Sequence, residues 1–348
     1  MSYGLTDSWC ILGNSARVRI LGVPEASLTP KMNVPSLDAL RAAARLVHSF
    51  IPPTPQIRWP LLCKRTGADV WVKHENHTPI GAFKIRGGLV YMDELIKQSP
   101  EVTGVLAATR GNHGQSVAFS ARAAGLRSTV VVPFGNSREK NDAMRALGAE
   151  LVEFGGDFQE AYEYSVQLAA SRGFHLVPSF HMTLVCGVAS YSLELMQTVP
   201  DLDLVYVPIG LGSGICGAIA ARDALGLRTE IVGVVAGGAP AYANSFRAGR
   251  PVPSTVAETI ADGVGCRVPH PEALDMILRG ASRIVTVSDG EIKTAMRHLF
   301  SDTHNVAEGA GAAALAGLLQ DDNRQGRRVA VVLTGGNIDR EVYAAILS

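Results

Sequence analysis

The chain has 348 residues, of which 47% are hydrophobic and 18% charged, and 32 basic residues balance 32 acidic ones. This length fits two domains or one large α/β unit, and the balanced charge excludes the basic excess expected of a nucleic-acid-binding or membrane-surface protein. The five cysteines are scattered and lack CxxC spacing, which argues against a disulfide framework or structural zinc and indicates a reducing compartment. No apolar run has the length of a signal peptide or membrane span, so we expect a cytoplasmic protein.

The amino-terminal part of the sequence predicts little regular structure. Residues 1–35 hold three prolines and little periodicity, so we expect an irregular arm with a short strand over 18–21. Ser36 is a good N-cap, and apolar residues recur on one face after it, which predicts a helix through about Phe50. The prolines that follow at 52, 53 and 55 end this helix.

From Gly104 onward, apolar strands alternate with helices. The sequence predicts strands over residues 105–108, 129–132, 151–154, 204–207, 231–235 and 329–333. It predicts helices over residues 113–124, 138–147, 158–171 and 215–225. Strands that are apolar throughout are typical of parallel sheets covered by helices on both faces, so we expect an α/β fold.

One lysine stands in a setting that favours reactivity. Residues 73–88 join a short strand at 70–72 to a helix through Pro79 and Gly81, and Lys84 follows directly after Phe83. Apolar neighbours lower the pKa of a lysine, because the ammonium loses hydration, and the neutral amine can then form a Schiff base with a carbonyl. Taken alone, a lysine at a helix start is more often a solvated surface group.

Four ordered motifs support a functional role for Lys84. They are residues 81–87 (GAFKIRG), 108–115 (ATRGNHGQ), 210–214 (GLGSG) and 333–337 (LTGGN). Their order and spacing resemble the pyridoxal-phosphate enzymes of the threonine dehydratase and serine racemase family, from about residue 55 to residue 337. The resemblance implies fold type II, with two open, mostly parallel twisted sheets flanked by helices as in the tryptophan synthase β subunit.

The resemblance also implies a domain organisation. A small domain is expected over 104–182, with 1–103 and 183–348 forming a large domain and pyridoxal 5'-phosphate bound between the two. Threonine dehydratases carry a C-terminal regulatory domain, and we expect none here because the chain ends soon after the last motif. A homodimer is implied as well.

The glycine-rich segment 210–214 is predicted to bind an anion. It follows a strand and opens a helix, so its free backbone N–H groups and the helix dipole face the same point. Gly212, Gly214 and Gly217 also match the dinucleotide pattern GxGxxG. That pattern expects an acidic residue at the end of the next strand, and residues 235–237 contain none, which favours a cofactor phosphate.

The resemblance assigns roles to residues at these motifs. Lys84 is expected to hold the cofactor and to abstract the α-proton, Asn112 to bond the ring hydroxyl oxygen, and Thr334 to bond the pyridine nitrogen. A neutral hydroxyl at that nitrogen makes the cofactor a weaker electron sink, which favours elimination. The other expected cofactor-binding residues are Phe83, Gly210, Leu211, Gly212, Ser213 and Gly214. The expected substrate-binding residues are Thr109, Arg110, Gly111, His113 and Glu308.

The alternatives at these positions are structural. Asn112 could be only an N-cap, Thr334 a hydroxyl satisfied by nearby backbone, and Glu308 an acid favoured by a helix dipole. Glu308 resembles the glutamate of the family's Glu-Pro-x-x-Gly segment, with Gly309 in place of proline.

Two departures from the family affect the expected reaction. Serine racemase has a serine that serves as second base where this chain has Arg110, and arginine cannot be deprotonated usefully at neutral pH. Arg110 therefore argues against racemisation by two bases and for a contact to a substrate carboxylate or to a protein acid. The carboxylates that hold a divalent cation in some relatives are missing from residues 235–240, so no metal is expected.

The expected activity is elimination of water from a β-hydroxy amino acid, giving a 2-oxo acid and ammonia. Threonine or serine is the default substrate, and 3-hydroxyaspartate or a bulkier β-hydroxy amino acid stays open. The alternatives are a β-replacement synthase or an amino-acid racemase of the same fold, and a pyridoxal-phosphate-binding protein without catalysis.

Overall fold

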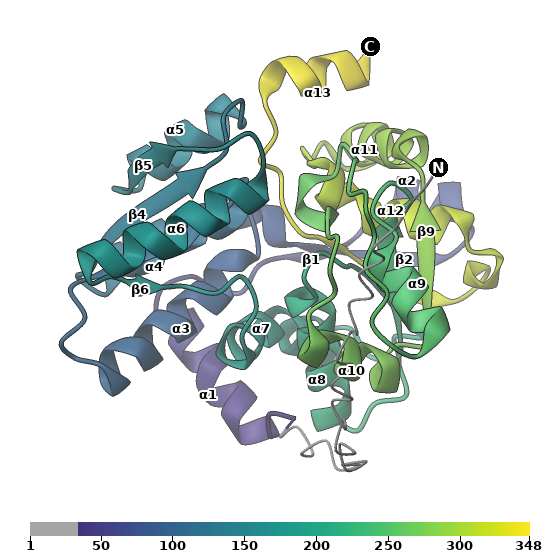
Figure 1. Ribbon diagram of the computed structural model, residues 1–348. Helices are drawn as coiled ribbons and strands as arrows, with labels where there is room; N and C mark the ends of the chain where they lie inside the picture. Colours follow the sequence, from purple (N-terminus) through teal and green to yellow (C-terminus); the bar gives the residue numbers. More distant parts are fainter. Residues whose placement is uncertain (1–33) are drawn as a thin grey trace, which may run out of the picture. The chain divides into compact units, whose positions relative to one another are not determined.

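The computed structural model describes residues 34–348, drawn in colour in Figure 1. The irregular arm expected before residue 34 and its short strand over 18–21 lie outside the described residues. In the described part, no helix is both long and apolar enough to cross a lipid bilayer.

The strands of residues 34–348 form two sheets. The strands are β1 (Gln56–Arg58), β2 (Asp69–His74), β3 (Gly104–Ala108), β4 (Arg127–Val132), β5 (Glu150–Glu153), β6 (His175–Leu176), β7 (Leu204–Pro208), β8 (Glu230–Ala236), β9 (Arg283–Val287) and β10 (Arg328–Leu333). One sheet has the order β1-β2-β10-β7-β8-β9 and the other β5-β4-β3-β6. All neighbouring strands are parallel except β1 and β2. The α/β fold with two mostly parallel sheets is confirmed.

Helices connect and cover these strands. They are α1 (Leu37–His48), α2 (Pro60–Thr66), α3 (Lys84–Gln98), α4 (Asn112–Ala123), α5 (Arg138–Ala146), α6 (Phe158–Arg172), α7 (Met182–Thr198), α8 (Ser213–Ala224), α9 (Ala241–Ala248), α10 (Pro271–Gly280), α11 (Asp289–Thr303), α12 (Gly309–Gln320) and α13 (Arg340–Leu347). The 3₁₀ turns are η1 (Glu75–His77), η2 (Asp262–Val264) and η3 (Asp322–Arg324).

The four-stranded sheet is covered on both faces. Along β3, Val105 and Ala107 pack in one cluster with α4, whereas Leu106 packs with α6. Successive side chains of a strand point to opposite faces, so α4 and α6 lie on opposite sides of the sheet, as Figure 1 shows for α6 in front. This two-sided burial is the reason that the strand is apolar throughout.

The six-stranded sheet is built in the same way. Val232 and Val234 of β8 belong to the core that contains α11 and α12. Gly233, between them, faces Ile215 of α8 on the other side, where an added Cβ would lie 3.1 Å from the Ile215 side chain. Both sheets therefore place helices on each face, and their loops meet at the carboxyl ends of the strands.

The expected elements agree closely with the structure where the pattern was clear. The side chain of Ser36 caps α1 by accepting a hydrogen bond of 3.3 Å from the backbone N–H of Ala39, and α1 ends at His48, slightly before the expected end. Helix α3 begins at Lys84. The four strands β3–β6 all lie between residues 104 and 176, but the domain boundaries at 104 and 182 stay a prediction.

A buried ion network holds the first turn of α3. The Arg86 guanidinium, fully buried, donates to Glu75 at 2.7 Å and to Glu194 of α7 at 2.5 Å. The ammonium of Lys73 lies 2.5 Å from the same Glu194. Two cations and two carboxylates thus compensate one another in the interior, and they tie α3 to β2 and α7 two residues beyond Lys84.

Candidate active site

Lys84 is fixed by contact between segments about 250 residues apart. Residues 81–83 run beside residues 334–336, with a bridge between Ala82 and Gly335. The backbone N–H of Phe83 donates to the Thr334 carbonyl at 3.0 Å, and that of Gly336 donates to the Gly81 carbonyl at 2.9 Å. The lysine at the start of α3 is therefore held next to the end of β10, an interior strand of the large sheet.

The Lys84 amine has the electrostatics of a nucleophile. Burial lowers its pKa from 10.5 to about 8. Its Nζ donates to the Ser213 hydroxyl at 3.3 Å and lies 5.1 Å from the centre of the Phe83 ring. Because no carboxylate pairs with it among the described residues, a useful fraction of the amine is neutral near pH 8.

The glycine loop 210–214 forms an anion site between β7 and α8. Gly212, the N-cap of α8, has φ 106°, a conformation that favours glycine. Within the part of the chain that the structure describes, the backbone N–H groups of residues 210–214 meet no acceptor. Gly210 leaves no room for a side chain, since an added Cβ would lie 2.2 Å from the Gly263 carbonyl oxygen. Free donors at a helix start suit a phosphate.

The turn between β3 and α4 holds Asn112 in one orientation. Asn112 Nδ2 donates to the Glu308 carboxylate at 2.5 Å, and Asn112 Oδ1 accepts from Asn337 at 2.8 Å. Gly335 makes this approach possible, because an added Cβ would lie 2.4 Å from Glu308 Oε1. The N-cap of α4 is Gly111, so the N-cap alternative for Asn112 is wrong. The Asn112 amide instead links α4 to the start of α12 and to the segment after β10.

Thr334 and His113 are two further polar residues of the candidate site. Thr334 is buried, and in the described residues its hydroxyl makes no hydrogen bond, so the purely structural alternative has no partner to support it. Burial and the nearby Lys84 lower the pKa of His113 to about 3. Its Nε2 is buried and has no partner in the described part of the chain. His113 is therefore a neutral side chain beside the lysine.

One cavity of about 740 Å³ contains every residue that the sequence predicted for the site. These residues are Phe83, Lys84, Thr109, Arg110, Gly111, Asn112, His113, Gly210, Leu211, Gly212, Ser213, Gly214, Glu308 and Thr334. They come from the carboxyl ends of strands in both sheets, where ligands of open α/β sheets bind. Their individual roles stay proposals.

The sequence analysis missed five charged residues of this cavity, Lys140, Asp157, Glu258, Asp262 and Arg267, and two of them, Lys140 and Asp262, contact predicted residues. Lys140 of α5 lies 3.3 Å from Glu308 and 3.8 Å from Asp262. Asp262 also lies 3.9 Å from Arg110. The protein acid nearest to Arg110 is thus Asp262, and Glu308 faces Lys140. No sequence motif marked Lys140 or Asp262, because their role in the site depends on contacts across the cavity.

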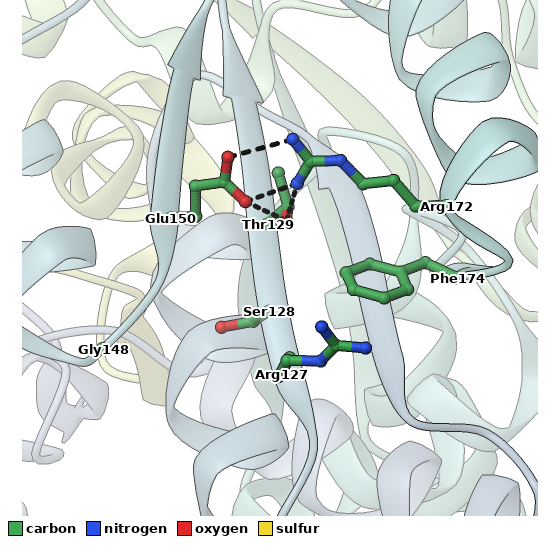
Figure 2. Close-up of a pocket in the computed structure, with 7 residues that line it drawn as sticks. All are labelled: Arg127, Ser128, Thr129, Gly148, Glu150, Arg172 and Phe174. Carbon is green, nitrogen blue, oxygen red and sulfur yellow. Dashed lines mark hydrogen bonds and ion pairs between the residues drawn. The ribbon is translucent and has the colours of Figure 1, made fainter.

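A second cavity, of about 460 Å³, lies at the opposite, amino ends of β4 and β5 (Figure 2). Its charged groups are already paired. Arg172 bonds the Glu150 carboxylate and the Thr129 hydroxyl, and the Arg127 guanidinium lies 4.9 Å from the centre of the Phe174 ring. We therefore interpret this cavity as part of the surface structure.

In residues 34–348, no group of three or more His, Cys, Asp or Glu side chains is arranged to hold a metal ion.

The fold, the desolvated lysine and the glycine loop define an enzyme that uses a phosphorylated carbonyl cofactor. Residues 47–335 match the model of the pyridoxal-phosphate dependent enzyme family, and the chain belongs to this family. The cofactor is pyridoxal 5'-phosphate. The residues present fit it, since Lys84 offers an amine for the aldehyde and the loop offers unpaired N–H donors for the phosphate. The dinucleotide interpretation of that loop is set aside.

The similarity to curated relatives and to a solved structure supports this family assignment. The chain is 31% identical to the L-threonine ammonia-lyase of Thermotoga maritima, over 90% of this chain and 78% of that one. It is 30% identical to the L-threo-3-hydroxyaspartate ammonia-lyase of Saccharomyces cerevisiae, over 91% and 98%. The crystal structure of the threonine deaminase from T.th. superposes with a TM-score of 0.82 at 31% identity, over 88% and 99%. The chain spans only 58–60% of the length of several biosynthetic threonine dehydratases that it matches.

Proposed function

We propose that the protein is a dehydratase that eliminates water from a β-hydroxy amino acid, yielding a 2-oxo acid and ammonia. The observation that carries this proposal is the neutral hydroxyl of Thr334, which has no hydrogen-bond partner among residues 34–348 and lies in the same cavity as Lys84. A neutral partner leaves a pyridine ring unprotonated, which favours loss of a β-substituent over a long-lived carbanion. The similarity to two ammonia-lyases supports the same reaction.

In this proposal each residue group has a defined task. The N–H groups of residues 210–214 bind the cofactor phosphate, Asn112 and Thr334 orient the ring, and the turn 109–113 binds the substrate carboxylate. When bound, the cofactor supplies a sink for the electron pair released at the substrate's α-carbon. The Lys84 amine, with a pKa of about 8, accepts the α-proton, and this requires that it be neutral when substrate is in place.

A substrate panel tests the proposal. L-threonine, L-serine, 3-hydroxyaspartate and 3-phenylserine are supplied to the holoenzyme, and 2-oxo acid and ammonia are measured. We expect equal amounts of both products from at least one substrate. A β-replacement synthase would instead consume substrate only when a thiol is added. A non-catalytic binding protein would show the cofactor spectrum and no turnover of any substrate.

We further propose a cytoplasmic homodimer. The scattered cysteines support a reducing compartment, and the family resemblance supports the dimer. Light scattering on the purified holoenzyme measures the mass directly, and a monomer at micromolar concentration would refute the second part.

A further inference from the structure

Lys140 is a buried cation beside the carboxylate-binding turn. Its side chain is 9% exposed and lines the active-site cavity. The aliphatic stem crosses Gly111, where an added Cβ would lie 2.7 Å from Lys140 Cδ and 3.5 Å from its Nζ. The helix that carries it is anchored elsewhere, since the Ser137 hydroxyl at its N-cap donates to Asp339 at 2.5 Å. The ammonium is therefore aimed at the turn between β3 and α4.

The hydrogen bonding of Lys140 is incomplete, in contrast to that of the other buried lysine, Lys73. The three donors of Lys73 meet Glu194 at 2.5 Å, the Thr54 carbonyl at 2.8 Å and Gln56 at 3.1 Å. Within residues 34–348, Lys140 Nζ has carboxylates only at 3.3 and 3.8 Å, which is longer than the roughly 2.7–2.9 Å of a charge-assisted bond. Lys73 is a structural cation, whereas Lys140 can still bind an acceptor in the cavity.

Lys140 also keeps its charge. Burial alone would lower its pKa, but the carboxylates of Glu308 and Asp262 outweigh this and raise the pKa above its ordinary value. The ammonium is thus present at neutral pH. Because Glu308 also accepts a hydrogen bond from Asn112 and Asp262 also lies near Arg110, neither carboxylate is paired with Lys140 alone.

The turn beside Lys140 offers neutral donors to the same anion. Thr109 Oγ1 accepts the N–H groups of Gly111 and Gly114. In the residues that the structure describes, the N–H groups of Asn112 and His113 at the start of α4 meet no acceptor, and no side chain caps this helix. Backbone donors and one buried ammonium therefore lie at the same turn of the cavity.

We propose that Lys140 is the cationic partner of the substrate's α-carboxylate and determines the preference for amino acids over their uncharged derivatives. This inference rests on the proposed function, in which the turn 109–113 binds that carboxylate. The cofactor phosphate is bound at the separate glycine loop 210–214. Glu308 is the resting partner of Lys140, and the substrate carboxylate takes its place when it binds.

The test compares a carboxylate with the matching amide. Glycine and glycinamide have no β-hydroxyl, so their binding can be measured by the absorbance change of the holoenzyme whether or not any substrate is dehydrated. Lys140→Met should weaken glycine binding about 10–150-fold, as expected for loss of a bond to a charged group, and change glycinamide binding less than about threefold. Lys140→Arg should retain part of the affinity for glycine. Lys97→Met, at an exposed lysine, is the matched control and should change neither.

Other outcomes overturn the inference. Equal losses for glycine and glycinamide would mean that Lys140 acts through the fold. A loss for glycine that disappears in a Glu308→Gln background would mean that the lysine serves only Glu308. If Lys140→Met does not fold, the comparison of Lys140→Arg with Lys140→Gln decides the question in the same way. Failure of the substrate panel alone would refute the dehydratase proposal and leave this measurement valid.

Discussion

Lys84 combines a common side chain with an uncommon environment. Its amine lies in a cavity with Ser213 and Phe83 as neighbours, and this desolvation brings its pKa to about 8. Lys84→Ala should abolish the visible absorbance of covalently held cofactor and all turnover, with the fold intact by circular dichroism. An alanine variant that keeps both properties would show that another lysine holds the cofactor.

The lowered pKa of Lys84 has a measurable consequence in the cofactor-free protein. The rate of covalent attachment of added cofactor depends on the neutral amine, so it should rise with pH through a midpoint near 8. An ordinary lysine would give a midpoint near its usual pKa of about 10.4. Absorbance-monitored reconstitution between pH 6.5 and 10.5 measures the midpoint, and a value above 10 would contradict the desolvation argument.

Thr334 makes a smaller contribution. Thr334→Ala should weaken cofactor binding by about 0.5–1.5 kcal/mol, the net value of one neutral hydrogen bond. Thr334→Asp should protonate the ring nitrogen and increase side reactions at the expense of elimination. Equilibrium dialysis and product analysis measure the two effects, and parent-like behaviour of both variants would make Thr334 only the end of a strand.

Arg110 lies in the turn that we propose to bind the substrate, and an arginine side chain cannot act as a base at neutral pH. We therefore expect deamination without measurable racemisation of unreacted substrate, determined by chiral chromatography. Arg110→Ala should raise KM more than it lowers kcat if the guanidinium contacts the substrate equally in ground and transition states. The pair with Asp262 is long, at 3.9 Å, and half-exposed, so the change in thermal stability should be small. Racemised substrate from the parent enzyme would refute the argument.

At the scale of elements, the position of helix α3 depends on the buried ion network around Arg86. Arg86 is fully buried between Glu75 and Glu194, and removing one member of such a network leaves carboxylates uncompensated. Arg86→Met should lower the free energy of unfolding by about 3–5 kcal/mol. Arg279→Met breaks an exposed pair with Asp275 and should cost at most about 1 kcal/mol. Urea unfolding measures both, and equal values would mean that the network contributes little.

The sequence predicted the elements whose pattern is local. Most of the alternating strands and helices between 104 and 236 were placed within a few residues, and so was Lys84 at the start of α3. The strands and α-helices not assigned are β1, α2, β6, α7, α9, α10, β9, α11, α12 and α13. Nearly all residues of α7 from 183 to 196 are buried, and α12 is buried along most of its length, so neither shows the one-sided apolar stripe that identifies a surface helix.

The residues of the candidate site also divide into those with a local sequence pattern and those without one. Lys84, Asn112 and the glycine loop lie in short motifs that can be read locally. Lys140 has no motif, and it matters only because folding brings α5 to Glu308 across the cavity. The partner of Arg110 could not be predicted either, because Asp262 lies in η2, far from Arg110 in the sequence. Contacts between distant segments of a chain are not encoded in any window of sequence.

At the scale of the whole molecule, the proposed cofactor site combines residues from both sheets. The glycine loop and Thr334 follow strands of the six-stranded sheet, whereas Asn112 lies in α4, which follows β3 of the four-stranded sheet. Bound cofactor should therefore stabilise both sheets together, by about 2.7 kcal/mol at a hundredfold excess over Kd. Calorimetry should show one cooperative transition that moves to higher temperature with pyridoxal phosphate. Pyridoxal without its phosphate should shift it much less.

The position of β10 has a consequence for synthesis of the protein. This strand lies between β2 and β7 in the large sheet, yet residues 328–333 follow every other strand in the chain. Until the ribosome has released them, β2 and β7 have no neighbour in common, and residues 81–83 have no segment to run beside. The reactive amine is thus placed only after β10 has been synthesised, so a growing chain that still lacks this strand does not carry a finished active site.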